Sequence, residues 1–156
     1  MADPAYVDGL KLLARRELSA SQVRQRLARK GHPAEAVDAA IGRLQAERAL
    51  DDARVAGAIA RTESMLKRRG RVRVRRQIEA AGIAPDLAER ALAEVFGDID
   101  PEAHLAEAID RRLKGRRLDA DPRAFGRLFR YLVGQGFEAD RVLAALRARR
   151  GPAGDE

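Results

Sequence analysis

Residues 23–41 have the sequence VRQRLARKGHPAEAVDAAI, and this stretch decides the fold of the 156-residue chain. Apolar residues lie four positions apart on both sides of Gly31. They are Val23, Leu27, Val37 and Ile41. This spacing puts the apolar side chains on one face of each of two helices, and the glycine supplies the left-handed residue that ends the first. The stretch therefore predicts two amphipathic helices joined at Gly31.

The same pattern recurs after about fifty residues, around Gly82 and again around Gly136. In every copy, apolar residues stand eight and four positions before the glycine and six and ten positions after it. In the later copies they are Val74, Ile78, Ala88, Leu92, Leu128, Leu132, Val142 and Leu146. A further amphipathic helix precedes each pair, with apolar residues Leu10, Leu13, Val55, Ile59, Leu105, Ile109 and Leu113. Agreement at four positions in three copies favours a repeat over a generic helical bundle with glycines aligned by chance.

The repeat predicts an all-α protein of three tandem three-helix repeats. The predicted segments are residues 1–49, 50–98 and 99–150, followed by a disordered tail at 151–156. Repeats of this kind stack on their neighbours and expose long surfaces, which suits the binding of an extended partner.

Polar residues mark the starts of several predicted helices. Ser19 and Gln22 fit a capping box, in which each side chain bonds the backbone N–H of the other residue. Asp100 and Asp121 each precede a proline, which suits the first position of a helix. The pair Asp51-Asp52 could hold a metal or act in acid–base chemistry, but its place at a helix start favours capping.

The composition indicates a basic protein with an acidic partner. There are 31 Lys and Arg residues against 24 Asp and Glu, giving a net charge of +7 and a pI near 10.6. Cysteine is absent, which excludes disulfides and thiolate chemistry and suits a reducing compartment. No run of eighteen apolar residues and no signal-peptide pattern is present. We expect a cytoplasmic protein without membrane attachment.

The basic residues are concentrated before the repeat glycines. The segments 19–31, 67–78 and 123–137, taken as the middle helices, contain fourteen Lys or Arg residues and no acid. The rest of the chain therefore carries a net charge of −7. Like charges on one helix cost roughly a few tenths of a kcal/mol, so the pattern predicts a bound polyanion. The predicted partner-binding residues are Arg24, Arg26, Arg29, Lys30, Lys67, Arg68, Arg69, Arg71, Arg73, Arg75, Arg76, Arg127 and Arg130.

Two positions of the repeat carry an arginine in both the second and the third copy. Arg73 and Arg76, like Arg127 and Arg130, stand nine and six residues before their glycine. Residues three apart share a helix face, so each pair predicts an arginine fork for phosphate or carboxylate. The alternative is that these arginines pair with acids on neighbouring helices.

Nucleic acid is one candidate for the polyanion, bound through phosphates without sequence preference. Residues 7–95 contain no aromatic side chain, which disfavours base stacking there. Phe125 and Phe129, spaced with Leu132 along one helix face, are predicted to be core residues. The helices after Gly31 and Gly82 carry acids, which disfavours sequence-specific reading by a helix-turn-helix.

The residues needed for catalysis are missing from the pattern. His32 and His104 lack zinc-ligand spacing, and His32 is predicted to be solvated in a turn. The segment 134–136 lacks the third glycine of a dinucleotide-binding loop, and no serine has a neighbouring base. We therefore expect a protein that is not an enzyme, with no metal site and no cofactor.

Several short motifs over roughly residues 6–149 resemble the bacterial RecX regulatory proteins. They are Arg15-Arg16-Glu17, Ser19, Leu27-Ala28-Arg29-Lys30-Gly31, Leu50-Asp51-Asp52 with Arg54, Arg69-Gly70 ahead of Arg75, and Gly136-Phe137. The resemblance implies three-helix repeats in a curved, elongated molecule. It also implies binding in the groove of the RecA recombinase filament, limiting its growth and its ATPase, strand-exchange and co-protease activities in DNA recombination, DNA repair and the SOS response. We expect a monomer; direct binding to single- or double-stranded DNA phosphates is the alternative function.

Overall fold

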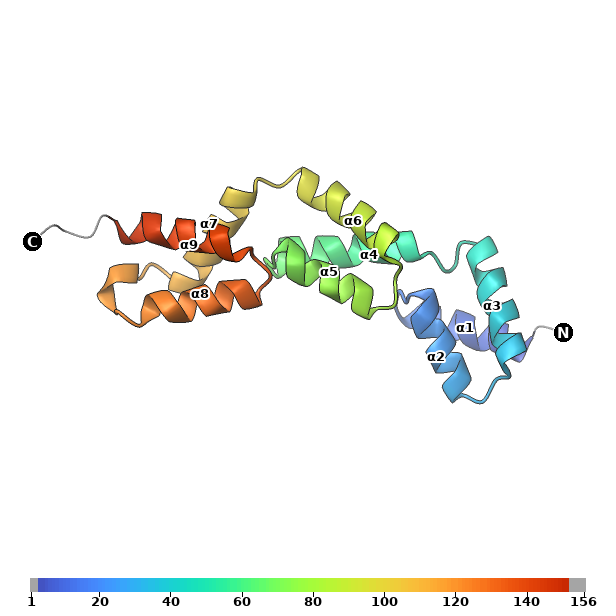
Figure 1. Ribbon diagram of the computed structural model, residues 1–156. Helices are drawn as coiled ribbons and strands as arrows, with labels where there is room; N and C mark the ends of the chain where they lie inside the picture. The colour runs from blue at the N-terminus through green and yellow to red at the C-terminus, as the bar shows by residue number, and fades with distance from the viewer. Residues whose placement is uncertain (1–2, 152–156) are drawn as a thin grey trace, which may run out of the picture. The chain divides into compact units, whose positions relative to one another are not determined.

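The computed structural model describes residues 3–151, and in that part of the chain it contains nine α-helices and no strand (Figure 1). The all-α prediction is confirmed. The helices are α1 (Pro4–Arg15), α2 (Ala20–Arg29), α3 (Ala34–Ala46), α4 (Asp52–Arg61), α5 (Arg71–Ala80), α6 (Pro85–Gly97), α7 (Pro101–Leu113), α8 (Ala124–Gly134) and α9 (Ala139–Arg150). A π-helical turn, Thr62–Leu66, follows α4, and a 3-10 turn, Leu118–Ala120, precedes α8. Among the described residues, no helix has the length and apolarity of a membrane span.

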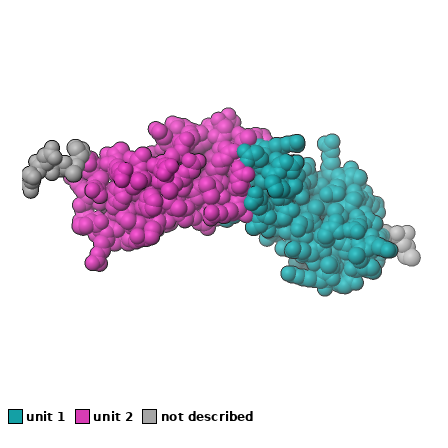
Figure 2. Space-filling view, in the orientation of Figure 1, with its two compact units in different colours: residues 1–59, 77–91 teal, residues 60–76, 92–156 magenta. Residues whose placement is uncertain are grey.

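The chain divides into two compact units, which Figure 2 shows in different colours. Unit 1 is formed by residues 1–59 and 77–91, and unit 2 by residues 60–76 and 92–156. Helices α4, α5 and α6 therefore contribute residues to both units. The predicted division into three segments stays a prediction. The predicted tail, apart from Gly151, lies outside the described residues.

The core of unit 1 forms where α1, α2 and α3 pack on one another. Its buried residues include the four repeat positions of the first copy with Leu18, Leu44 and Leu50. Helix α1 forms as predicted and contributes the small residues Ala5 and Gly9 to the core, whereas Leu10 is 39% exposed. A Cβ at Gly9 would lie 2.8 Å from the Leu44 Cδ1. Helix α1 thus lies too close to Leu44 of α3 for a side chain at position 9, while Tyr6, Leu12 and Leu13 pack against the same core.

The core of unit 2 lies among α7, α8 and α9. Its buried residues are Leu105, Ala108, Ile109, Leu118, Leu128, Leu132, Phe137, Val142 and Leu146. Phe125 and Phe129 are partly buried and pack against this core, which confirms their predicted role. The repeat positions of the second copy are also buried, as predicted.

Three of the predicted helix caps are confirmed and one is wrong. The Ser19 Oγ accepts a hydrogen bond from the Gln22 N–H at 3.1 Å within a complete capping box. The carboxylates of Asp51 and Asp100 accept backbone N–H groups at 3.2 and 3.1 Å. Helix α8, however, begins only at Ala124, because the Asp121 carboxylate accepts the Arg123 N–H at 2.9 Å and closes a separate turn.

Each unit contains one contact between a glycine turn and the start of the preceding triplet's middle helix. In unit 1 the Ser19 Oγ donates a hydrogen bond to the Ala81 carbonyl. In unit 2 the Gly70 N–H donates one to the Gln135 carbonyl at 2.9 Å. Both carbonyls belong to the residue directly before a turn glycine, and both donors lie twelve residues before the glycine of their own copy. The repeat therefore produces the same contact twice.

The backbone conformation favours glycine at all three turns, and at two of them neighbouring atoms also leave no room for a Cβ. Gly31, Gly82 and Gly136 have left-handed φ angles of +93°, +78° and +99°, as predicted. A Cβ at Gly82 would lie within 3.0 Å of the Ser21 side chain, and one at Gly136 within 3.0 Å of the Arg73 N and Cβ. A Cβ at Gly31 would meet no heavy atom within 4 Å.

Gly82→Ala and Gly136→Ala should therefore destabilise the protein more than Gly31→Ala. All three variants place alanine at a left-handed φ, which costs about 1–2 kcal/mol. Only the first two add a steric overlap, worth about 1–3 kcal/mol more. Free energies of unfolding from urea titrations measure the difference. Equal losses at the three positions would contradict the packing argument.

Candidate partner-binding site

Half of the predicted cations of the first copy are paired with acids from neighbouring helices. Arg24 pairs with Asp38 of α3, and the Lys30 Nζ lies 3.8 Å from the Asp8 carboxylate of α1. The predicted cations of this copy without an ion pair to a described residue are Arg26 and Arg29. An acid-free helix in the sequence is therefore partly neutralised in the fold.

His32 is not solvated, and that prediction is wrong. Its Nε2 lies 2.7 Å from the Asp8 Oδ2, and its side chain is only 15% exposed. The hydrogen bond with His32, aided by the charge of Lys30, holds the pKa of Asp8 below its ordinary value although burial opposes this. The Asp8 carboxylate thus partly neutralises the positive charge at the carboxyl end of α2.

The prediction that residues 67–78 form one helix is also wrong. Residues 67–69 follow the π turn, and α5 begins only after Gly70. The N–H of Gly70 bonds the Gln135 carbonyl, and a Cβ at Gly70 would lie within 3.0 Å of the Gly136 backbone. This tertiary contact interrupts the helix and puts three predicted cations on a connecting segment.

The cations of this segment are paired within unit 2. The Glu63 carboxylate lies 2.9 Å from the Lys67 Nζ and 2.5 Å from the Arg69 Nη1. Arg68 pairs with Glu107 of α7. Burial acts to raise the pKa of Glu63, but the hydrogen bonds from Lys67 and Arg69 outweigh it and hold that pKa below its ordinary value. Glu63 is thus a buried carboxylate that is charged at neutral pH.

Helix α5 carries the other four predicted cations of the second copy: Arg71, Arg73, Arg75 and Arg76. The Arg73 Nη1 donates to the Gly134 carbonyl at 3.3 Å. Arg71 and Arg75 are half-buried and interact within the chain. Arg76 is exposed and makes no ion pair with a described residue. Of these four side chains, Arg76 is therefore the most accessible to a partner.

The two predicted arginine forks each contain one engaged and one accessible side chain. The Arg127 Nη2 lies 2.7 Å from the Asp121 Oδ2, and this hydrogen bond lowers the pKa of Asp121. Arg130 is exposed and, among the described residues, has no ion-pair partner. Arg73 and Arg76 differ in the same way. Pairing with neighbouring acids thus accounts for some of the predicted cations and leaves others accessible.

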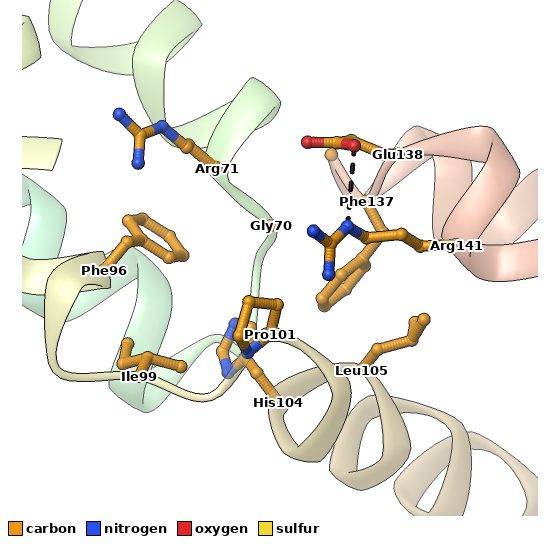
Figure 3. A pocket seen from close by; sticks show the side chains of 11 residues that line it. Gly70, Arg71, Phe96, Ile99, Pro101, His104, Leu105, Phe137, Glu138 and Arg141 are labelled. Atoms are coloured by element: carbon orange, nitrogen blue, oxygen red, sulfur yellow. Dashed lines mark ion pairs between the residues drawn. The ribbon is translucent and has the colours of Figure 1, made fainter. Parts of the chain in front are cut away.

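Unit 2 also has a pocket with a largely apolar lining, in which Gly70 is one wall (Figure 3). Its apolar side chains are Phe96, Ile99, Pro101, Leu105 and Phe137, and its charged ones are Arg71, Glu138 and Arg141. His104 is buried beside it, with its ring against Phe96 and Phe137 and its Nε2 3.0 Å from the Arg69 carbonyl. Because a carbonyl only accepts, the Nε2 carries a proton. Within residues 3–151, no three His, Asp or Glu side chains meet in a metal-binding arrangement.

The sequence analysis missed a basic run at the end of α7. Five cations stand among the seven residues 111–117: Arg111, Arg112, Lys114, Arg116 and Arg117. The Arg112 guanidinium stacks over the Tyr131 ring, 4.2 Å from its centroid. The run lies outside the glycine-aligned helices, so the repeat does not predict it. The density of five cations in seven residues is the sequence signal that indicates it.

Known proteins resemble this chain in sequence over almost its whole length. The family model for the first three-helix domain of RecX matches residues 5–44, which cover α1, α2 and most of α3. The regulatory protein RecX of Halorhodospira halophila is 33% identical over 150 residues, covering 93% of this chain and 91% of the relative. The chain belongs to the RecX family of regulatory proteins. The regulatory protein RecX of Geobacillus kaustophilus is also 33% identical, over 143 residues, but this chain spans only 52% of its length.

Solved structures share the fold of this RecX-family chain. The crystal structure of RecX from Lactobacillus salivarius has a TM-score of 0.76 at 16% identity and covers 91% of this chain and 92% of its own. A second crystal structure, of a regulatory protein RecX, has a TM-score of 0.76 at 22% identity and covers 90% of this chain and 70% of its own. At these identities the likeness establishes the fold alone.

Glu63→Gln should destabilise the protein by about 1–3 kcal/mol at neutral pH, because it removes the charge that holds Lys67 and Arg69. The folded-state pKa of Glu63 is lowered, so its contribution is complete above the ordinary carboxyl pKa and is lost as the pH falls through the lowered value. Urea titrations at neutral pH and at a pH below that value measure both effects. Glu107→Gln is the control, since Glu107 is 55% exposed and its pair with Arg68 is worth about 0–1 kcal/mol. Equal losses in the two variants at neutral pH would refute this role of Glu63.

Proposed function

We propose that this RecX-family protein binds the RecA recombinase filament and limits its assembly and its ATPase, strand-exchange and co-protease activities. The observation that carries the proposal is the similarity to regulatory RecX proteins over more than nine-tenths of the chain. The protein acts as a cytoplasmic monomer and needs no chemistry of its own, because occupying the filament surface hinders the exchange of subunits and the entry of DNA.

The accessible cations support an acidic partner. Arg29, Arg76 and Arg130 are exposed, and none makes an ion pair with a described residue. Guanidinium groups bind carboxylates and phosphates equally well in bidentate geometry, so these side chains suit both components of a filament on DNA. The paired cations at the surface also remain usable, since an exposed pair is worth only about 0–1 kcal/mol.

An exposed apolar pair supports a protein component in that partner. Met65 and Leu66 are 58% and 74% exposed in the π turn. The other face of the turn is held by the buried Ser64, whose Oγ donates to the Ala60 carbonyl at 2.6 Å, and by the buried Glu63. A π-helical turn is frequent at functional sites, and apolar side chains contribute little to phosphate contacts. Met65 and Leu66 therefore suit a protein surface beside Lys67.

The second candidate function is general nucleic-acid binding through phosphates, which the excess of cations favours. A gel shift with naked DNA beside one with preformed RecA filament separates the two. A filament-specific regulator shifts the filament at lower concentration, whereas a general DNA-binding protein shifts naked DNA at least as well.

Purified protein at several-fold excess should lower the RecA ATPase rate on single-stranded DNA. Arg76→Glu should raise the concentration for half-inhibition by about three- to tenfold, because it replaces a contact with a repulsion. Arg90→Glu is the control, since Arg90 is exposed on α6, lies outside the predicted set and changes the net charge equally. An ATPase rate unchanged by the wild-type protein would refute the proposal.

Leu66→Ser should weaken binding to the filament by roughly 10- to 100-fold, because burying a leucine against a partner is worth about 1.5–3 kcal/mol. Its exposure means that the melting temperature should not change. Binding to naked DNA should also stay the same. A gel shift on filament and on naked DNA measures both affinities, and an equal loss on the two would exclude an apolar contact with protein.

A further inference from the structure

The basic run at residues 111–117 contributes to a hollow of unit 2 that no acid lines. The side chains around it are Lys67, Arg68, Ala108, Arg111, Arg112, Lys114, Tyr131 and Gln135. Five of these eight residues are cations, and they come from two parts of the chain: the segment before α5 and the end of α7 with the residue after it. The polar residues Tyr131 and Gln135 come from α8 and the position after it. A second hollow shares Arg112 and Lys114 and adds Arg116, Arg117 and Arg127. The second hollow also contains Asp121, which pairs with Arg127, so its free charge lies near the two residues that the hollows share.

Helix electrostatics account for only part of this charge. Cations in the last turn of a helix interact favourably with its dipole, which suits Arg111 and Arg112 in α7. Lys114 and Arg116 lie beyond the end of the helix, and Lys67 belongs to a different segment. Their convergence with Arg111 therefore has no explanation in the stability of α7.

Several groups in the hollow lack an anion. Lys67 pairs with Glu63 and Arg68 with Glu107, but Arg111 and Lys114 make no ion pair with any residue between 3 and 151, and neither does Arg116 of the second hollow. The Arg68 Nε is buried and has no hydrogen-bond partner in the described part of the chain.

The backbone at two of the cations is also unusual. Arg68 and Lys114 have φ angles of +56° and +51°, in the left-handed region where glycine or asparagine is favoured. A third residue, Arg48, has a φ of +57° but belongs to unit 1 and does not line the hollow. Two left-handed positions beside one hollow thus carry a long cation where a short residue would be less strained.

We infer that this hollow binds phosphate groups of a nucleic-acid backbone. Cations from two separate segments, together with the polar residues Gln135 and Tyr131, suit the oxygens of a phosphate better than a planar carboxylate, which one guanidinium satisfies. Because the two hollows share Arg112 and Lys114, cations of both are available to successive negative groups, as a polyanion provides. The inference needs no recombinase: it assigns a place for phosphate contacts that DNA in a filament and the naked DNA of the second candidate function both offer.

The test compares Lys114→Asn with Arg48→Asn in the full-length protein. Each variant removes one positive charge at a left-handed position that asparagine tolerates, so neither should lower the melting temperature. Fluorescence anisotropy with a labelled oligothymidylate of about 20 nucleotides, without RecA, gives the dissociation constant over a range of salt concentrations. Lys114→Asn should raise the dissociation constant about three- to tenfold and reduce the salt slope by about 1, whereas Arg48→Asn should change it less than about twofold.

Equal losses in the two variants would overturn the inference, because they would reflect net charge alone. Inorganic pyrophosphate and oligoglutamate, titrated by calorimetry, provide the other comparisons. Binding of either one with the same dependence on Lys114, without binding of the oligothymidylate, would also overturn it, since the site would then serve a small phosphate or an acidic peptide.

Discussion

The close approach of a turn glycine to the start of the preceding middle helix is the constraint on which the rest of the structure depends. A helix start has N–H groups without partners inside the helix. Here the Gly70 N–H bonds the carbonyl before Gly136, and the Ser19 hydroxyl bonds the carbonyl before Gly82. Neither bond would form if a Cβ stood at the turn. In unit 2 the segment that ends at Gly70 also contacts α7, because the Arg69 carbonyl bonds His104 and Arg68 pairs with Glu107.

The acids of the protein restrain its cations unequally. Pairs such as Arg24 with Asp38 are exposed, so solvent screens them and a partner's acid can replace Asp38 at small cost. Glu63 is buried, so breaking its pairs with Lys67 and Arg69 would leave an uncompensated buried charge. These pairs therefore stabilise the fold and are not readily exchanged for a partner's acid. Counting charges along the sequence does not distinguish these cases, because burial decides whether an ion pair is structural or exchangeable.

The features predictable from sequence are those that depend on local chain geometry. Helical period and left-handed turns gave the repeat, its buried positions and the Ser19 capping box. The wrong predictions depend on contacts between distant residues: Gly70 interrupts a helix because the third triplet's turn lies against it, and His32 is covered because Asp8 of α1 faces it. The exposure of Leu10 also depends on a distant contact, because Gly9, and not Leu10, is the residue of α1 that lies against Leu44 of α3. The repeat does not predict the basic run at 111–117, because these residues lie outside the glycine-aligned helices.

The two basic segments of unit 2 differ in what accompanies their charge. The exposed apolar Met65 and Leu66 stand just before Lys67 and suit a protein surface, while Lys67 itself lines the basic hollow. Residues 111–117 have cations with a single leucine and no exposed apolar pair, a combination suited to phosphates. A filament of protein on DNA presents both kinds of surface, whereas naked DNA or a free protein presents only one. The division of chemistry between the segments therefore fits a nucleoprotein partner better than either component alone.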